Sequence, residues 1–164
     1  RGKSIQPEMS DINQVVREVG EACRERAAHA GVRVVTQPGP DVPELLFDPA
    51  SLYHALLNLV LNALDAHEEA GKDDRWVEVS TRHDGLHGIT LIEVEDNAGG
   101  MDEETRTNLF RPFYSTKGGK GSGLGMPAAK KAIEDHGGTI LVESRPGEGS
   151  KLIIELPEHG TGNV

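Results

Sequence analysis

The sequence predicts an α+β fold with two layers, a mixed and mostly antiparallel sheet packed on about three helices. Three segments have apolar residues at the spacing of amphipathic helices, and several shorter segments alternate apolar and polar residues as half-buried strands do. A length of 164 residues fits one domain with one core. Since helices precede and interrupt the strands, we expect the two kinds of element to form separate layers.

The N-terminal third begins with a polar segment and one helix. Residues 1–10 show no periodicity and are expected to be a lead-in. A helix is expected from the Asp11 cap to the residue before Gly31, because apolar residues recur there every three or four positions. A short β-branched strand over residues 32–36 and a loop with three prolines over residues 37–43 follow it.

The second helix has strong boundary signals. Asp48 followed by Pro49 is a carboxylate cap with proline at the first helical position, and the helix is expected to run to about Ala70 before Gly71. One wide face of it is apolar and predicts core packing: Leu52, Ala55, Leu56, Leu59, Val60 and Ala63.

The polar side of this helix carries the first candidate site. Asn58, Asn62 and Asp65 gather with His54 within roughly 80° of arc. Asn58 and Asn62 are four residues apart, so their carboxamides lie one above the other. Amide oxygens beside a carboxylate suit a hard cation such as Mg²⁺. Taken alone, the pattern also fits an ordinary solvated helix face.

The second half of the chain holds the remaining elements. Four strands are expected there, over residues 76–82, 89–95, 139–144 and 151–156. Two helices are expected, over residues 101–109 and 124–136. The first two strands should join at a turn centred on Asp84 and Gly85, Asp102 should cap the shorter helix, and Pro127 is tolerated in the first turn of the longer one. Residues 112–123 have no regular pattern.

Composition excludes several functions. A formal net charge of −10 argues against nonspecific binding to nucleic acid or to an anionic membrane surface. The single cysteine, Cys23, rules out an internal disulfide and fits a reducing compartment. No run approaches the roughly 20 apolar residues of a membrane span, and residues 1–10 hold no signal-peptide core. We therefore expect a cytoplasmic domain without direct membrane contact.

Residues 96–101, DNAGGM, follow directly on a predicted strand. The Asp96 carboxylate could accept a hydrogen bond from an exocyclic amine such as that of adenine, and Gly99 and Gly100 permit close backbone approach or positive φ. A simple Asx turn is the alternative.

Residues 109–117, LFRPFYSTK, place Phe110 and Phe113 beside Arg111 and Lys117. Core packing accounts for a phenylalanine more easily than for Lys117, which opens a glycine-rich run.

That run, GGKGSGLG over residues 118–125, leads straight into a predicted helix. Backbone N–H groups and the macrodipole at a helix N-terminus favour an anion, so phosphate binding is one interpretation and a flexible linker is the other. The spacing matches neither a P-loop nor the dinucleotide-binding glycine motif.

These motifs in this order, with GEGSKLIIELP over residues 147–157, resemble the ATP-binding catalytic domain of bacterial sensor histidine kinases. The resemblance covers residues 11–157; residues 158–164 would be a tail, and residues 1–10 the lead-in from an absent dimerisation and phosphoacceptor region. It implies the Bergerat fold, a two-layer α/β sandwich shared with gyrase and heat-shock chaperones, with a glycine-rich ATP lid over about residues 98–122.

The resemblance also implies ATP and Mg²⁺ as ligands. Asn62 matches the asparagine that coordinates Mg²⁺, and Asn58 matches its companion; with Lys117 they would be the catalytic residues. Asp96 matches the aspartate that bonds the adenine amino group, and Gly100 would leave room for the purine. The other nucleotide-binding residues implied are Asp65, Met101, Phe110, Arg111, Phe113, Lys117, Gly121, Ser122, Gly123, Leu124, Gly125 and Ser150.

Two departures from the family pattern stand out. Asp65 occupies a position where many histidine kinases carry a basic residue that touches phosphate. No phosphoacceptor is recognised, because His67-Glu68 resembles the acceptor dipeptide but lies on the metal-binding helix itself. All seven histidines are therefore interpreted as surface or packing residues.

The function that the resemblance implies is phosphoryl transfer in two-component signalling. The domain would donate the γ-phosphoryl group of Mg-ATP to a histidine on its own dimerisation domain, which is absent here, and a response-regulator aspartate would receive it next. The chain alone is expected to be a monomer, the full-length protein a homodimer, and a membrane-bound sensor with this part in the cytosol is compatible. Alternatives are a protein-serine kinase of the anti-sigma-factor type and a non-catalytic nucleotide-sensing module.

Overall fold

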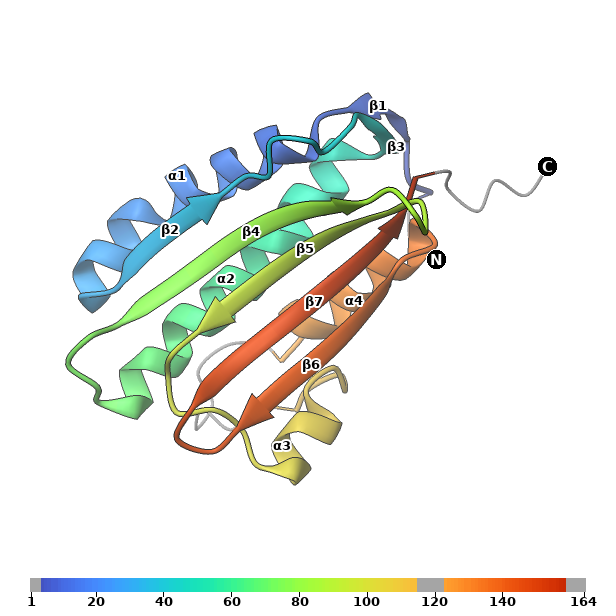
Figure 1. Cartoon of the computed structure of the whole chain (residues 1–164). Helices are drawn as coiled ribbons and strands as arrows, with labels where there is room; N and C mark the ends of the chain where they lie inside the picture. Colours follow the sequence, from blue (N-terminus) through green and yellow to red (C-terminus); the bar gives the residue numbers. More distant parts are fainter. Residues whose placement is uncertain (1–3, 115–122, 159–164) are drawn as a thin grey trace.

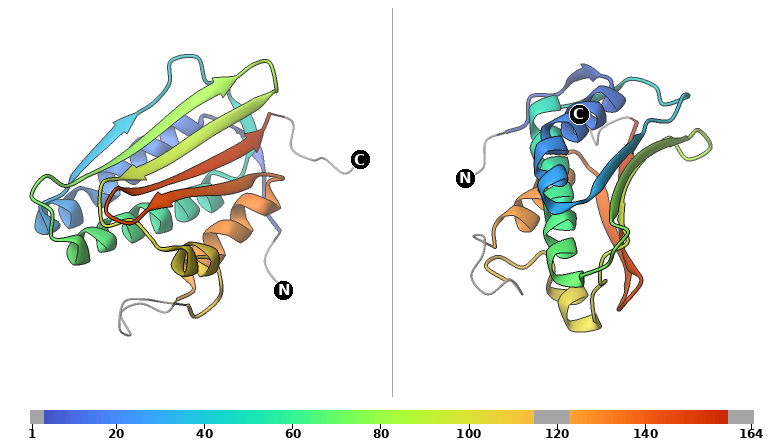
Figure 2. Two further views of the ribbon diagram at one scale, coloured as in Figure 1. Left: turned by 60° about the horizontal axis from the view of Figure 1, so that its bottom comes forward. Right: turned by 90° about the vertical axis from the view of Figure 1, so that its left-hand side faces the viewer.

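The structure, a computed structural model, describes residues 4–114 and 123–158. Within them the chain forms a two-layer sandwich, a five-stranded sheet with helices covering one face (Figures 1 and 2). The strand order is β2-β4-β5-β7-β6, and only the β2–β4 pair is parallel. The strands span β2 Arg33–Gln37, β4 Trp76–Asp84, β5 Ile89–Asp96, β6 Thr139–Arg145 and β7 Gly149–Pro157. The predicted α+β architecture with a mixed, mostly antiparallel sheet is confirmed.

The helices lie on one side of the sheet, as the edge-on view in Figure 2 shows. Their bounds are α1 Ile12–Ala30, α2 Pro49–Ala70, α3 Glu103–Asn108 and α4 Gly125–Asp135. The Asp11 carboxylate accepts from the Asn13 amide at 2.9 Å, and the Asp48 carboxylate accepts from the Ser51 amide at 3.2 Å. Gly31 and Gly71 follow the helices at φ 67° and 65°, the left-handed conformation of a C-terminal cap. The predicted boundaries of α1 and α2 are therefore confirmed.

The core lies between α2 and the sheet. The apolar face predicted for α2 is buried throughout, and its side chains join those of α1, α4 and the inward face of the strands in one cluster. At the N-terminus of α2, the amide of the capping residue Asp48 donates to His136 Nε2 at 3.0 Å. His136 Nδ1 lies 2.6 Å from the Ala132 carbonyl oxygen. This buried histidine joins the end of α4 to the start of α2.

Two predictions about local structure were wrong. Residues 8–10 are not only a polar lead-in: they form β1, Glu8–Ser10, which pairs antiparallel with β3, Leu45–Phe47. Three-residue strands are too short to show alternation, and tertiary contact decides them. The turn after β4 is also later than expected, because Asp84 still pairs with Ile89 and the turn occupies residues 85–88.

No helix in the described part of the chain has both the length and the apolar character needed to cross a membrane.

We predict that Leu59→Ala lowers the free energy of unfolding by about 3 kcal/mol, because Leu59 is 0% exposed and its loss leaves a cavity beside the sheet. Leu86→Ala is the matched control: Leu86 is 89% exposed in the β4–β5 turn, so the same chemical change should cost less than about 0.5 kcal/mol. Urea denaturation measures both. Equal effects of the two substitutions would contradict the placement of the core.

Candidate functional site

Asp96, the last residue of β5, is a carboxylic acid held almost out of water, with 5% of the residue exposed. One carboxylate oxygen accepts from the Ala98 amide at 3.0 Å. Burial raises the pKa of the Asp96 carboxyl above its ordinary value of 3.8, and the Ala98 amide, His67 and the Ser150 amide act in the opposite direction. A buried acid with a raised pKa at a strand end is a candidate for ligand recognition.

The loop after Asp96 fits tightly against the β6–β7 hairpin. Gly100 has φ +69°, and a Cβ at this position would lie 2.0 Å from the Arg145 carbonyl oxygen. Gly149 has φ +100°, and a Cβ there would lie 2.1 Å from the Asp96 carbonyl oxygen. The close backbone approach and positive φ that the glycine pair predicts are therefore confirmed at Gly100, and the room for a purine that the resemblance implies there stays a prediction.

Two serines close this end of the site. Ser150 is the register partner of Asp96, and its hydroxyl lies 2.8 Å from that of Ser144; its contact with a nucleotide stays a prediction. Ser144 also accepts from the Met101 amide at 2.8 Å and donates to the Gly149 carbonyl at 3.1 Å. Sequence reasoning missed Ser144, since a serine near the end of a strand gives no signal of its own.

Asn97 and His67 join the segment that carries Asp96 to the neighbouring strand and to α2. The Asn97 side chain accepts from the Trp76 amide at 2.9 Å and donates to the Asp74 carbonyl at 2.7 Å. His67, fully buried on α2, has Nε2 2.9 Å from the Trp76 carbonyl oxygen. The C-terminal part of α2 therefore lies directly against the segment that carries Asp96. The burial of His67 also agrees with its interpretation as a packing residue.

Asn58 lies where α2 meets the start of α4. A Cβ on Gly125 would be 3.5 Å from Asn58 Oδ1, an ordinary contact distance. The residue that precedes α4, Leu124, provides no side-chain cap for the first turn of the helix. Asn58 and Asn62 are both half-buried on the same helix. The Asn58 amide oxygen and the N-terminus of α4 thus come together at this end of the site.

Asp65 has a partner on the neighbouring helix that the sequence did not predict. Its carboxylate forms an ion pair with Arg26 of α1, and Arg26 lies 3.9 Å from Glu68 as well. The acid is therefore engaged with the neighbouring helix, and its contact with a nucleotide stays a prediction. Because the pairing joins two helices, sequence spacing on α2 alone gives no sign of it.

The residues around the predicted lid meet at one point. Phe113 has φ +65° and is 75% exposed, and its amide donates to the Gly123 carbonyl at 2.9 Å. A Cβ on Gly123 would lie 2.7 Å from Phe113 Cα, so the two ends of the intervening segment touch. Lys117, Gly121 and Ser122 lie outside the described residues, and their roles stay predictions.

Phe110 and Arg111, which precede Phe113 in the chain, each contact a neighbouring side chain. Phe110 packs against the core, with the Lys130 amine 5.5 Å from its ring centroid. The Arg111 guanidinium donates to Asn108 Oδ1 at 3.1 Å, and its expected approach to phosphates stays a prediction. The contact between Lys130 and Phe110 was not predicted, because the two residues lie 20 positions apart in the sequence.

The described residues contain no cluster of three or more His, Cys, Asp or Glu side chains that could hold a metal by itself. The amide oxygens of Asn58 and Asn62 are weak single ligands, but they suit Mg²⁺, which binds through few protein groups when substrate phosphates and waters complete its shell. The residues present therefore fit a metal that arrives with its nucleotide.

We predict that Gly100→Ala destabilises the fold by at least about 3 kcal/mol, because its Cβ would overlap the Arg145 backbone and its φ is positive. Gly147→Ala is the control: its φ is +82°, but nothing lies within 4 Å of the added Cβ, so only the cost of the left-handed conformation, about 1 kcal/mol, applies. Thermal unfolding of both variants tests this. If the two midpoints agree, the loop and the hairpin are not interlocked.

Comparison with known proteins agrees with this geometry. The family described as "Histidine kinase-, DNA gyrase B-, and HSP90-like ATPase" matches residues 47–160. The sensor histidine kinase ZraS of Klebsiella oxytoca is 33% identical over 150 residues, which cover 92% of this chain and 31% of that protein. The sensory histidine kinase/phosphatase NtrB of Vibrio alginolyticus is 32% identical over 164 residues, covering 95% of this chain and 45% of that protein. The chain thus spans less than half the length of these relatives.

Solved structures share the fold. Full-length ShkA in complex with AMPPNP superposes with a TM-score of 0.85 at 24% identity, over 98% of this chain and 33% of that chain. The nucleotide-free catalytic domain of the histidine kinase ThkA gives a TM-score of 0.81 at 23% identity, over 94% of this chain and 97% of that chain. This chain belongs to the family of histidine kinase-, DNA gyrase B- and HSP90-like ATPases, and it has the Bergerat fold of a sensor histidine kinase catalytic domain.

Proposed function

We propose that this chain binds Mg-ATP and donates its γ-phosphoryl group to a histidine on a separate dimerisation domain, from which a response-regulator aspartate receives it. The observation that supports this best is the buried acid Asp96 at the end of β5, beside the half of α2 that follows the two asparagines. The relatives are named as sensor histidine kinases, which supports the transferase role.

Asp96 would recognise the base. A carboxylate accepts hydrogen bonds and cannot donate them when ionised, so it suits the exocyclic amine of adenine. Guanine has a carbonyl oxygen at the same ring position, and two acceptors facing each other in a buried site would be left unpaired. Because Asp96 is shielded from water, this difference favours ATP over GTP.

Asn58, Asn62 and the start of α4 would hold the other end of the nucleotide. His67, the α2 residue beside the Asp96 segment, comes nine positions after Asn58, which at 1.5 Å per residue is about 14 Å of helix. The base would therefore lie near the C-terminal half of α2 and the phosphates near Asn58 and Gly125. Mg²⁺, when bound, would neutralise phosphate charge; the Asn62 amide oxygen would be its protein ligand, and the Asn58 amide would help to hold a ligand water and the phosphates.

Phosphoryl transfer needs little covalent chemistry from this chain. The acceptor imidazole nitrogen forms a bond to the γ-phosphorus, the bond from that phosphorus to the β–γ bridging oxygen breaks, and ADP leaves with the electron pair. The imidazole attacks in its neutral form, and the proton on its other nitrogen goes to solvent. Asn58 is an amide and cannot deprotonate water, which favours transfer over hydrolysis. Lys117 would spread the transition-state charge.

The partners of this reaction are proposals for the longer protein. They are its own dimerisation domain, which carries the acceptor histidine, and a cognate response regulator. We expect the chain by itself to be monomeric and cytosolic, and the full-length protein to be a homodimer. Acid-labile phosphohistidine as the product in the full-length protein fits the proposal; acid-stable phosphoserine would assign the domain to protein-serine kinases instead.

We predict that Asp96→Asn and Asn62→Ala each weaken binding of Mg²⁺ with a non-hydrolysable ATP analogue at least tenfold, because each removes an acceptor that the nucleotide or its metal requires. Isothermal titration calorimetry measures the affinity. Asp41→Asn, at an exposed loop position, is the control and should bind as the unmutated chain does. Saturable binding that survives both site substitutions would contradict the proposed site.

We also predict that nucleotide affinity falls on acidification at a pH above the ordinary aspartate value of 3.8. The pKa of Asp96 is raised by burial, so its carboxylate gains a proton earlier than an exposed acid when the pH falls. The ionised carboxylate is the acceptor that adenine needs, so binding should in turn lower the pKa of Asp96. Carboxyl-carbon NMR titration of the free and analogue-bound chain checks the sign: an Asp96 signal whose midpoint is unchanged or raised by the analogue would refute it.

A further inference from the structure

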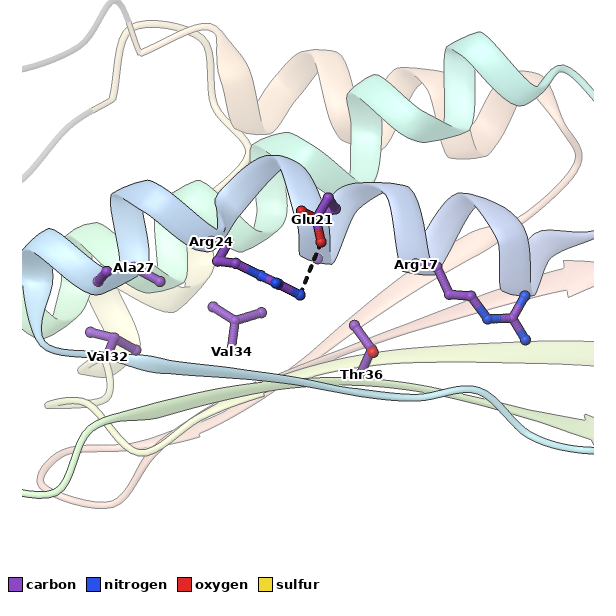
Figure 3. A pocket seen from close by; sticks show the side chains of 9 residues that line it. Arg17, Glu21, Arg24, Ala27, Val32, Val34 and Thr36 are labelled. Carbon is purple, nitrogen blue, oxygen red and sulfur yellow. Dashed lines mark ion pairs between the residues drawn. The ribbon is translucent and has the colours of Figure 1, made fainter.

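A groove of about 420 Å³ lies between α1 and β2, at the edge of the sheet (Figure 3). Arg17, Glu21 and Arg24 line it from the helix, and Val34 and Thr36 line it from the strand. None of the residues that line this groove belongs to the nucleotide site proposed above. Its function is therefore a separate question.

The strand beside the groove has an open edge. β2 pairs with β4 and, among the described strands, with no other. The Arg33 amide donates toward β4, to the Arg75 carbonyl at 2.9 Å, so alternation along the strand directs the N–H and C=O groups of Val34 and Thr36 outward. No described residue pairs with these outward groups. An edge of this kind is a template for another strand.

Helix α1 reaches past this edge. Gly20 touches β2 so closely that an added Cβ would be 2.6 Å from Thr36 Cγ2, and Arg17, Glu21 and Arg24 continue the helix surface along the groove. A further strand would lie about 4.8 Å beyond β2. One face of that strand would then be covered by α1, so the groove has the shape that a missing edge strand would fill.

The groove is cationic at one end and apolar at the other. Ala27 and Val32 line the apolar end. Arg24 is paired with Glu21 at 2.9 Å, whereas Arg17 forms no ion pair with any residue that the structure describes. The two arginines and one glutamate give a local excess of positive charge in a chain whose net charge is −10. Such a groove favours a segment with an acidic residue at one end.

We propose that this groove is a docking site for an extended polypeptide segment that adds a strand to the sheet at β2, with an apolar side chain over Ala27 and Val32 and an acidic side chain opposite Arg17. Backbone hydrogen bonds to Val34 and Thr36 provide affinity for any extended segment. Contacts at the apolar and cationic ends of the groove select the side chains of the segment that binds. This site is independent of nucleotide binding.

A second copy of the chain fits the groove less well than a separate segment. Antiparallel pairing of two β2 strands puts both α1 helices on the same face of the joined sheet, since the symmetry axis is then perpendicular to it. The local excess of positive charge beside the groove would then be repeated on both helices of that face, and like charges brought together are unfavourable.

The test uses the chain itself and a capped hexapeptide, Thr-Val-Thr-Val-Thr-Asp, whose valines and aspartate share one face when extended. Amide NMR titration should shift the signals of Val34, Thr36 and the Arg17–Arg24 turns of α1. A peptide with lysine in place of the aspartate should bind about tenfold more weakly. Arg17→Ala should remove that preference, and Arg82→Ala, at an exposed arginine on β4, should keep it.

A second variant tests the strand geometry. Val34→Pro removes an outward N–H and leaves the inward bonds to β4 intact, so it should abolish peptide binding without unfolding the chain. Should this variant fail to fold, peptides N-methylated at single alternate amides give the same test on the unmutated chain. Equal binding of the two peptides, shifts outside the groove, or no shift at millimolar peptide would overturn the proposal. Concentration-dependent changes at Val34 and Thr36 without peptide would also overturn it and assign the groove to a second copy.

Discussion

The burial of Asp96 at the end of β5 is the constraint on which the rest of the site depends. A carboxyl group removed from water is costly unless hydrogen bonds compensate it, and here the amides of Ala98 and Ser150 do so in part. Those amides are in position only because Gly100 and Gly149 let the loop after β5 and the β6–β7 hairpin touch backbone to backbone. The pKa of Asp96 stays raised in spite of them, because burial outweighs these hydrogen bonds. An adenine amine that donates to this carboxylate would further favour its charged form.

Helix α2 joins this acid to the phosphate end of the proposed site. One face of α2 packs in the core, and this packing fixes the position of the helix relative to the sheet. The positions of Asn58 and Asn62, on the other side of the helix, are therefore fixed as well. His136 fixes the position of α4: it accepts a hydrogen bond from the Asp48 amide and thereby holds the C-terminal end of α4 against the start of α2. Gly125, at the other end of α4, consequently lies beside Asn58. Binding groups from distant parts of the sequence thus meet through the core and one buried histidine.

Much of the fold was predictable because the signals are local. Asp11 and Asp48 cap their helices and Gly31 and Gly71 end them, as the sequence indicates. Contacts that span the fold were not predictable: the pairing of β1 with β3, the ion pair of Asp65 with Arg26, and the bond of Ser144 to the Met101 amide depend on which elements become neighbours. The order of the motifs along the sequence identified the family. Lys117, Gly121 and Ser122 lie outside the described residues, and their roles remain predictions.

The most direct measurement is a crystal structure of this chain with Mg²⁺ and a non-hydrolysable ATP analogue. We expect the adenine amine within hydrogen-bond distance of the Asp96 carboxylate, the phosphates at the start of α4, and the Asn62 amide oxygen about 2.1 Å from the metal. A nucleotide bound elsewhere, for example beside Arg17 in the α1–β2 groove, or an Asp96 carboxylate that makes no contact with the base, would contradict it.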